Sequence, residues 1–135
     1  MIQKGAAKVG YLYRREIPIY LQLIDIMKSR IINGSYHAGD RLPSIRDMAL
    51  EYEVTPNTIQ RALAVFEQDG IILTERTNGK RITSDTQKII SLKNEHLKQS
   101  VHTLVNELIN TGYTYDEIYR VFEKEMASND DEKHT

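Results

Sequence analysis

The 135-residue sequence contains no cysteine, no tryptophan and only three prolines. Without cysteine the chain can form no disulfide, no thiolate nucleophile and no cysteine-based zinc site, and this composition fits a reducing cytosol. No apolar run approaches the roughly 18 residues that a membrane helix needs. Residues 1–10 are small and polar and lack the apolar centre of a secretory signal peptide. We therefore expect a cytoplasmic protein with no membrane segment.

Sequence patterns that mark catalytic or metal centres are also missing. The chain has no GxSxG, no P-loop, no HExxH and no isolated pair of carboxylates in an apolar setting. Its four histidines are scattered. His96 and His102 would point to different faces of one helix, which makes them a poor metal pair. We expect no enzyme activity, no metal and no cofactor.

The net charge of −1 conceals an uneven distribution along the chain. Residues 1–84 carry 12 Lys and Arg against 9 Asp and Glu, a net charge of +3. Residues 85–135 carry 6 against 10, a net charge of −4. A basic front and an acidic back suit a protein that meets phosphate with one end only, although a mixed surface could vary this much by chance.

The first half of the chain begins with a segment that lacks any period. Residues 1–16 are expected to form a mobile arm, in which Arg14 and Arg15 are more simply solvated than bound to a phosphate backbone. Pro18 suits the first position of a helix. An apolar face with helical spacing then runs to residue 31, and an Asn-Gly pair ends this helix.

Two short helices and a strand pair follow. Ser44, with Asp47 three residues later, predicts the capped start of a helix that ends near Tyr52. Thr55 as N-cap and Pro56 as the first helical residue predict the next helix, which ends at an Asp-Gly pair. Residues 71–75 and 81–83 predict two strands around a turn at 77–80. This order is the outline of a winged helix-turn-helix, whose second helix enters the major groove of DNA.

The predicted recognition helix begins with side chains that can read bases. Asn and Gln can pair with adenine, Thr can touch a phosphate or a thymine methyl, and Arg can reach guanine or phosphate. The hairpin turn adds cations, which a narrow minor groove favours, and a glycine that permits close approach. The alternative is a set of ordinary polar residues on capped helices and a plain hairpin turn. The candidate DNA contacts are Arg46, Thr55, Asn57, Thr58, Gln60, Arg61, Arg76, Asn78, Gly79, Lys80 and Arg81.

The last third of the chain predicts two further helices. An apolar stripe spans residues 86–111, and Thr114 with Glu117 forms a capping box for a final helix whose inner face is Ile118, Phe122 and Met126. The first stripe is wider than one short helix can cover, so we expect a second subunit to cover it. The alternative is a helix folded wholly onto its own N-terminal domain. The expected dimerisation residues are Ile90, Leu97, Val101, Leu104, Leu108, Tyr115, Tyr119 and Phe122, the two tyrosines packing a dimer seam rather than forming a ligand cage.

The motif G-x-Y-x-x-G-D-R-L-P-S-x-R-x-x-A runs from residue 34 to residue 49. With it, residues 17–83 resemble the DNA-binding domain of the GntR family of bacterial transcription regulators. The resemblance implies DNA contacts by Arg46, by the first turn of the recognition helix and by the wing-tip Gly79. The chain departs from the family habit at Pro56 and Thr77, where many members have Arg and Gly, and at Arg81, where many have an aromatic residue. Operator preference therefore cannot be copied from those members.

The short C-terminal region is similar to that of the YtrA subfamily, whose members use two such helices to dimerise. The resemblance implies a homodimeric regulator that represses a transporter operon by binding an inverted-repeat operator. A winged helix that binds a protein and not DNA is the alternative, and it would show apolar or aromatic anchors at the recognition turn. The sequence identifies no small-molecule effector.

Together these patterns predict a mainly α (α+β) chain with four parts. Residues 1–16 form the arm, and residues 17–84 form a winged helix-turn-helix that binds double-stranded DNA. Residues 85–128 form a two-helix dimerisation region, and residues 129–135 form a polar tail.

Overall fold

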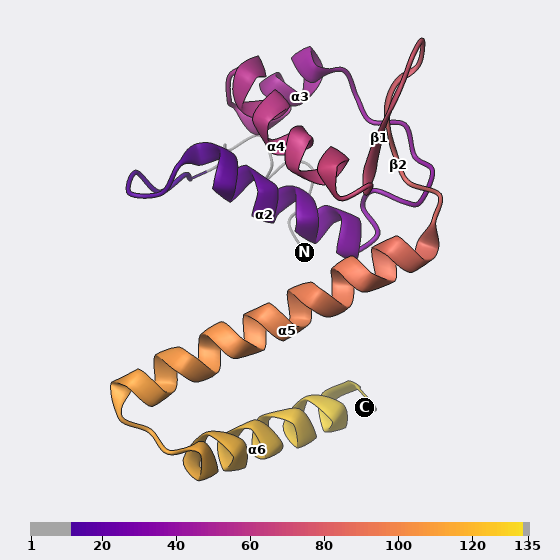
Figure 1. Cartoon of the computed structure of the whole chain (residues 1–135). Coiled ribbons are helices and arrows are strands. Elements are labelled where there is room, and N and C mark those ends of the chain that lie inside the picture. The colour runs from indigo at the N-terminus through magenta and orange to yellow at the C-terminus, as the bar shows by residue number, and fades with distance from the viewer. Residues whose placement is uncertain (1–11, 134–135) are drawn as a thin grey trace. The chain divides into compact units, whose positions relative to one another are not determined.

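The computed structural model describes residues 12–133 (Figure 1). The chain divides into two units, Met1–Lys93 and Asn94–Thr135, which we call the head and the C-terminal unit and describe separately. The prediction of a mainly helical chain with a small hairpin is confirmed. The elements are α2 (Ile19–Ile32), α3 (Ile45–Tyr52), α4 (Pro56–Gln68), β1 (Ile72–Glu75), β2 (Gly79–Ile82), α5 (Thr86–Thr111) and α6 (Tyr115–Lys133).

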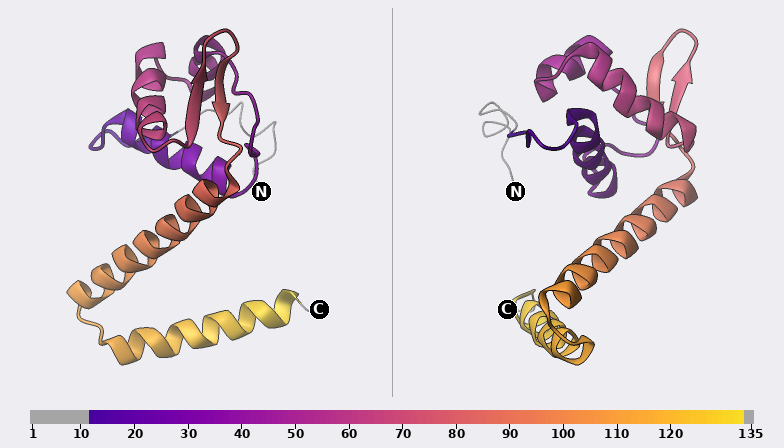
Figure 2. Two further views of the ribbon diagram at one scale, coloured as in Figure 1. Left: turned by 45° about the vertical axis from the view of Figure 1, so that its right-hand side comes forward. Right: turned by 60° about the vertical axis from the view of Figure 1, so that its left-hand side comes forward.

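The head is built on one apolar core. Helix α4 packs against both α2 and α3, and the β1–β2 hairpin follows beside it (Figures 1 and 2). Burying each large apolar side chain contributes roughly 1.5–3 kcal/mol, so this core fixes the angle between the two helices of the helix-turn-helix. Its largest fully buried side chains are Leu23, Met27, Met48, Tyr52, Ile59, Leu63, Phe66, Ile72 and Ile82.

The helix starts follow the predicted caps. The Ser44 hydroxyl accepts a hydrogen bond from the Asp47 amide at 3.0 Å. The Thr55 hydroxyl accepts one from the Thr58 amide at 3.2 Å, with Pro56 in the first turn. Between the helices Glu53 takes a left-handed conformation with φ of 57°, which ends α3 and turns the chain into α4.

The start of α2 lies one residue later than predicted. Pro18 is the residue before the helix, with an extended ψ of 136°, and α2 begins at Ile19. The carbonyl of Pro18 nevertheless accepts a hydrogen bond from the Leu21 amide at 3.2 Å. Pro18 is thus the N-cap residue of α2 and joins the extended segment before it to the helix.

The wing is an antiparallel hairpin in which Ile72 pairs with Ile82 and Glu75 with Gly79. A third stretch of backbone lies on the other edge of β2. There the Leu42 amide donates to the Lys80 carbonyl, and the Ile82 amide donates to the Asp40 carbonyl, each at 2.8 Å. The sequence predicted no strand over residues 40–42, because so short a pairing leaves no alternating pattern. It ties the hairpin to the loop that precedes α3.

Part of the predicted arm is held against the head. Residues 1–11 lie outside the described structure, but residues 12–18 are described and form a loop that leads into the start of α2 (Figure 1). The Tyr13 hydroxyl donates to the backbone carbonyl of Tyr52 at 2.7 Å. The sequence gives no sign of this bond, because the two residues are 39 positions apart.

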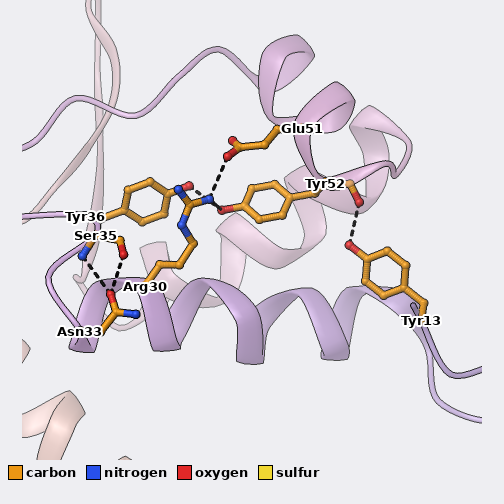
Figure 3. A network of polar contacts seen from close by, with 7 residues as sticks. All are labelled: Tyr13, Arg30, Asn33, Ser35, Tyr36, Glu51 and Tyr52. Atoms are coloured by element: carbon orange, nitrogen blue, oxygen red, sulfur yellow. Dashed lines mark hydrogen bonds and ion pairs between the residues drawn. The ribbon is translucent and has the colours of Figure 1, made fainter. Parts of the chain in front are cut away.

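A polar network crosses the head between α2 and the end of α3 (Figure 3). Arg30 donates to the Tyr52 hydroxyl at 2.6 Å and to Glu51 at 3.0 Å. The Tyr36 and Tyr52 hydroxyls lie 2.5 Å apart, and the Arg30 guanidinium stands 4.5 Å from the centre of the Tyr36 ring. Burial, then the neighbouring Tyr36, raises the pKa of Tyr52 above its usual range.

Helix α5 begins in the head and continues into the C-terminal unit. Ile89 and Leu92 pack against the core of the head, and the head as divided above extends to Lys93, whereas the winged helix-turn-helix was predicted to end at residue 84. From Leu97 onward the described side chains of α5 are exposed or half-buried. The first turns of α5 therefore belong structurally to the head.

The C-terminal unit starts α6 with the predicted capping box. Glu117 accepts from the Thr114 amide at 3.0 Å, and Thr114 accepts from the Glu117 amide at 3.1 Å. The hydrogen bond from the Thr114 amide, and then the one that the Thr114 hydroxyl donates to the same carboxylate, lower the pKa of Glu117. Helix α6 continues to Lys133, beyond residue 128 where the sequence placed its end, because no Gly or Pro interrupts it. None of the helices in residues 12–133 is long and apolar enough to span a bilayer.

Candidate nucleic-acid interface

The helix before the turn presents one basic side chain at its start. Arg46 is the second residue of α3 and is exposed. The cap at Ser44 fixes the backbone immediately before it. Arg46 forms no salt bridge with any residue of the described chain, so its guanidinium is available to a phosphate or a base edge.

The first turn of α4 separates its polar side chains into two groups. Thr55 and Thr58 are engaged in the cap, their hydroxyl oxygens lying 2.9 Å apart, and Thr58 is half-buried. Asn57 and Gln60 are exposed, three residues apart, and therefore share a helix face. Their amides are the groups in this turn best placed for base edges, whereas the threonines first hold the turn in shape.

Arg61 lies in the second turn of α4 and contacts α2. Its guanidinium carbon stands 3.9 Å from the centre of the Tyr20 ring, a cation–π contact. The side chain is still exposed, so a phosphate could be reached. This stacking holds the Arg61 side chain on the side of α4 that faces α2.

The tip of the wing is open. Arg76 and Asn78 are exposed in the turn between the strands. Gly79 has φ of 75°, which favours glycine, and no atom of the described chain lies within 4 Å of the place where its Cβ would be. Backbone and side chains here can approach a groove without first displacing part of the protein.

The two remaining wing cations are paired inside the head. Lys80 Nζ lies 2.6 Å from Glu67 Oε1 and 3.0 Å from Thr74 Oγ1. Arg81 pairs with Glu75 and donates to the Gly39 carbonyl at 2.7 Å. The hydrogen bond from Arg81 is the largest cause of the lowered pKa of Glu75.

Through these pairs Lys80 and Arg81 stabilise the position of the wing. This role is additional to the DNA contact that the sequence predicts for both side chains. Lys80 connects the wing to α4, and Arg81 connects it to the loop before α3. In the structure β2 begins at Gly79 and the hairpin register places residues 74 and 80 opposite each other, whereas the sequence pattern placed residue 80 in the turn. The partner Glu67 could not be found from the sequence pattern, because it lies on a helix whose orientation depends on the core.

The candidate dimerisation residues lie on exposed helix faces. Among the described residues, α5 has none that is buried and α6 has only Ile118. Phe122 and Met126, expected on an inner face with Ile118, are 38% and 64% exposed, because nothing in the described chain covers them. The exposed candidates are Ile90, Leu97, Val101, Leu104, Tyr115, Tyr119 and Phe122, while Leu108 is half-buried.

The described residues include no group of three or more His, Asp or Glu that could hold a metal ion. His102 instead contacts the side chain of Asn106, at 3.1 Å on the polar face of α5. Around α3, the start of α4 and the wing tip, the open polar groups include the guanidinium groups of Arg46 and Arg76 and the amides of Asn57 and Gln60, which suit an anionic polymer with readable base edges.

Comparison with known proteins agrees with this geometry. Residues 19–82 match the family model described as bacterial regulatory proteins, gntR family. The chain is 35% identical to YhcF of Bacillus subtilis, an uncharacterised HTH-type transcriptional regulator, over 75% of this chain and 84% of that protein. It is 30% identical to the HTH-type transcriptional repressor YtrA of B. subtilis, over 78% and 82%.

A solved structure extends this likeness beyond the head. The GntR family transcriptional regulator from Listeria monocytogenes superposes with a TM-score of 0.77 and 37% identity. The match covers 83% of this chain and 98% of that one. The likeness to this protein therefore includes residues beyond the head.

Proposed function

The chain belongs to the GntR family of bacterial regulatory proteins, and from this premise we propose that it acts as a homodimeric repressor on an inverted-repeat operator. It is a DNA-binding transcription regulator and not an enzyme. The observation that carries the mode of binding is the exposed pair Asn57 and Gln60 at the start of α4, together with the exposed Arg46 and the open wing tip.

In the proposed complex the start of α4 enters a major groove and the wing tip meets the neighbouring minor groove. Arg46 and Arg76 then contact phosphates or base edges, while Asn57 and Gln60 read bases. The remaining candidates, Thr55, Thr58, Asn78 and Gly79, approach the backbone around these contacts. Lys80 and Arg81 act mainly by holding the wing in place.

The proposal of a homodimer is supported by the C-terminal unit. Two helices that bury a single described side chain between them cannot form a stable core alone. A second copy would cover the exposed face of α5 and the aromatic face of α6, and it would do so symmetrically. Two heads related by a two-fold axis would contact half-sites about 34–36 Å, or a multiple of this, apart.

The proposal of repression is supported by the similarity to YtrA, which is named a repressor. The family resemblance extends it to a transporter operon as the target. Bound over a promoter, a dimer of this size would exclude the polymerase by occupying the same DNA. No small-molecule effector is needed for this mechanism.

The decisive experiment is selection of bound duplexes from a random DNA pool, followed by retardation of the selected fragment in a salt series. We expect an inverted repeat and an affinity that falls steeply with salt. Recovery of single, unpaired half-sites would contradict the homodimer. Failure to enrich any sequence would favour the alternative, a winged helix that recognises a protein.

A further inference from the structure

The short segment before α2 is fastened to the helix-turn-helix at its turn. The Tyr13 hydroxyl donates to the backbone carbonyl of Tyr52 at 2.7 Å. Tyr52 is the last residue of α3 and stands directly before the turn into α4. Figure 3 shows Tyr13 at this carbonyl, at the end of the network farthest from Asn33. The segment is thereby placed beside the start of the recognition helix.

A second attachment fixes the backbone that follows. The Gln22 side chain accepts from the Arg14 amide at 2.7 Å and donates to the Arg14 carbonyl at 2.8 Å. The side-chain amide of Gln22 also donates to the Ile17 carbonyl at 2.8 Å. These three hydrogen bonds together favour one conformation of this turn.

The attached turn displays one arginine without a partner. Arg14 pairs with Glu16 at 2.8 Å, so its charge is partly neutralised. Arg15 is exposed and forms neither a salt bridge nor a side-chain hydrogen bond within residues 12–133. Arg61 of α4 stacks on Tyr20, in the first turn of α2, so the same end of α2 borders the recognition helix. Arg15 and Arg61 form a basic flank at this end.

We propose that Arg15 binds a DNA backbone phosphate outside the groove occupied by α4, and that Tyr13 and Gln22 position it there. The inference rests on the proposed entry of α4 into the major groove. A phosphate is the partner because the turn offers one exposed guanidinium on a held backbone, while the neighbouring amide of Gln22 is already engaged with that backbone. Since the backbone is already ordered, binding costs less conformational entropy than it would for a free arm.

The test compares Arg15→Gln with Arg120→Gln, which removes the same charge from an exposed site on α6. Each full-length protein is titrated onto a mixed-sequence duplex in a salt series, followed by fluorescence anisotropy. Loss of one phosphate contact lowers the slope of log K against log salt by roughly 0.9. We expect this loss for Arg15→Gln and no change for Arg120→Gln. A wild-type slope for Arg15→Gln would overturn the proposal.

The positioning role of Tyr13 has its own test in Tyr13→Phe, which keeps every charge. We expect weaker binding than wild type, and no further weakening when Tyr13→Phe is added to Arg15→Gln, because both act on one contact. Equal effects in both backgrounds would overturn the positioning role. If the wild-type protein itself failed to bind the duplex, the proposed function would fail, which is a different result from an unchanged Arg15→Gln.

Discussion

The ammonium nitrogen of Lys80 on the wing lies 2.6 Å from a carboxylate oxygen of Glu67 in the last turns of α4. The wing and the recognition helix are therefore joined by a charged contact whose lysine side chain is only 20% exposed. A cation held in this way has a different role from one at the wing tip, and the two roles can be separated by substitution.

Lys80→Gln is expected to destabilise the head by about 1 kcal/mol, because it weakens a half-buried pair. Arg76→Gln, at the exposed tip, is expected to leave thermal stability unchanged and to lower the salt slope of DNA binding by roughly 0.9. Thermal denaturation and a salt series on both variants check this. The opposite pattern would identify Lys80 as the main phosphate contact of the wing.

Arg46→Ala is expected to weaken operator binding by roughly tenfold, since a charged contact of this kind is worth about 1–3 kcal/mol. The protein should remain folded, because Arg46 is exposed and the Ser44 cap does not involve its side chain. Circular dichroism and anisotropy measure the two properties. Unchanged affinity at moderate salt would remove Arg46 from the interface.

Asn57→Ala and Gln60→Ala are expected to change which DNA sequence the protein prefers. We expect no change in the salt dependence of its DNA affinity. A well-paired amide discriminates against the wrong base by about 1–3 kcal/mol, whereas it neutralises no phosphate. Repeating the selection from a random pool with each variant would show relaxed preference at one position of each half-site. Thr55→Ser, which retains the capping hydroxyl, is the matched control.

The parts of this fold that could be predicted from the sequence are those whose contacts join residues a few positions apart. Ser44 with Asp47, Thr55 with Thr58 and Thr114 with Glu117 each form their bonds three positions apart. A cap is recognisable because the groups that satisfy the first helical amides lie in the same short stretch of sequence. The helix starts at these caps were therefore confirmed.

The contacts that were missed join residues far apart in the sequence. Tyr13 reaches Tyr52 across 39 positions, and Lys80 reaches Glu67 across 13. Both depend on how α2, α4 and the hairpin pack, which no local pattern encodes. For the same reason, the sequence could propose cations for the DNA interface but could not separate open side chains from those paired inside the head.

The buried Tyr52 predicts a loss of stability in alkali. Burial, then Tyr36, raises the folded pKa of Tyr52 above the ordinary value of 10.0, so the fold favours the neutral phenol. This contribution is present in full below about pH 10 and is lost as the pH rises above it. Melting temperatures of wild type and Tyr52→Phe from about pH 8 to about pH 11 test this. The variant should be less stable at pH 8 but should lose less on going to pH 11, with Tyr113→Phe as an exposed control.

The apolar face of α5 gives the sharpest test of assembly. Leu104→Glu with Leu108→Glu places two charges on the face that a second copy would cover. Burying these carboxylates without partners would cost more free energy than association of the two subunits provides. Sedimentation should therefore show a monomer, and binding to an inverted repeat should fall towards that of a single half-site. Gln99→Glu with Asn106→Glu adds the same two charges on the polar face, where Gln99 and Asn106 contact Glu95 and His102, and should leave the dimer intact. A dimer that survived the leucine substitutions would place the interface on the aromatic face of α6, and Tyr119→Glu would then be the substitution that separates the subunits.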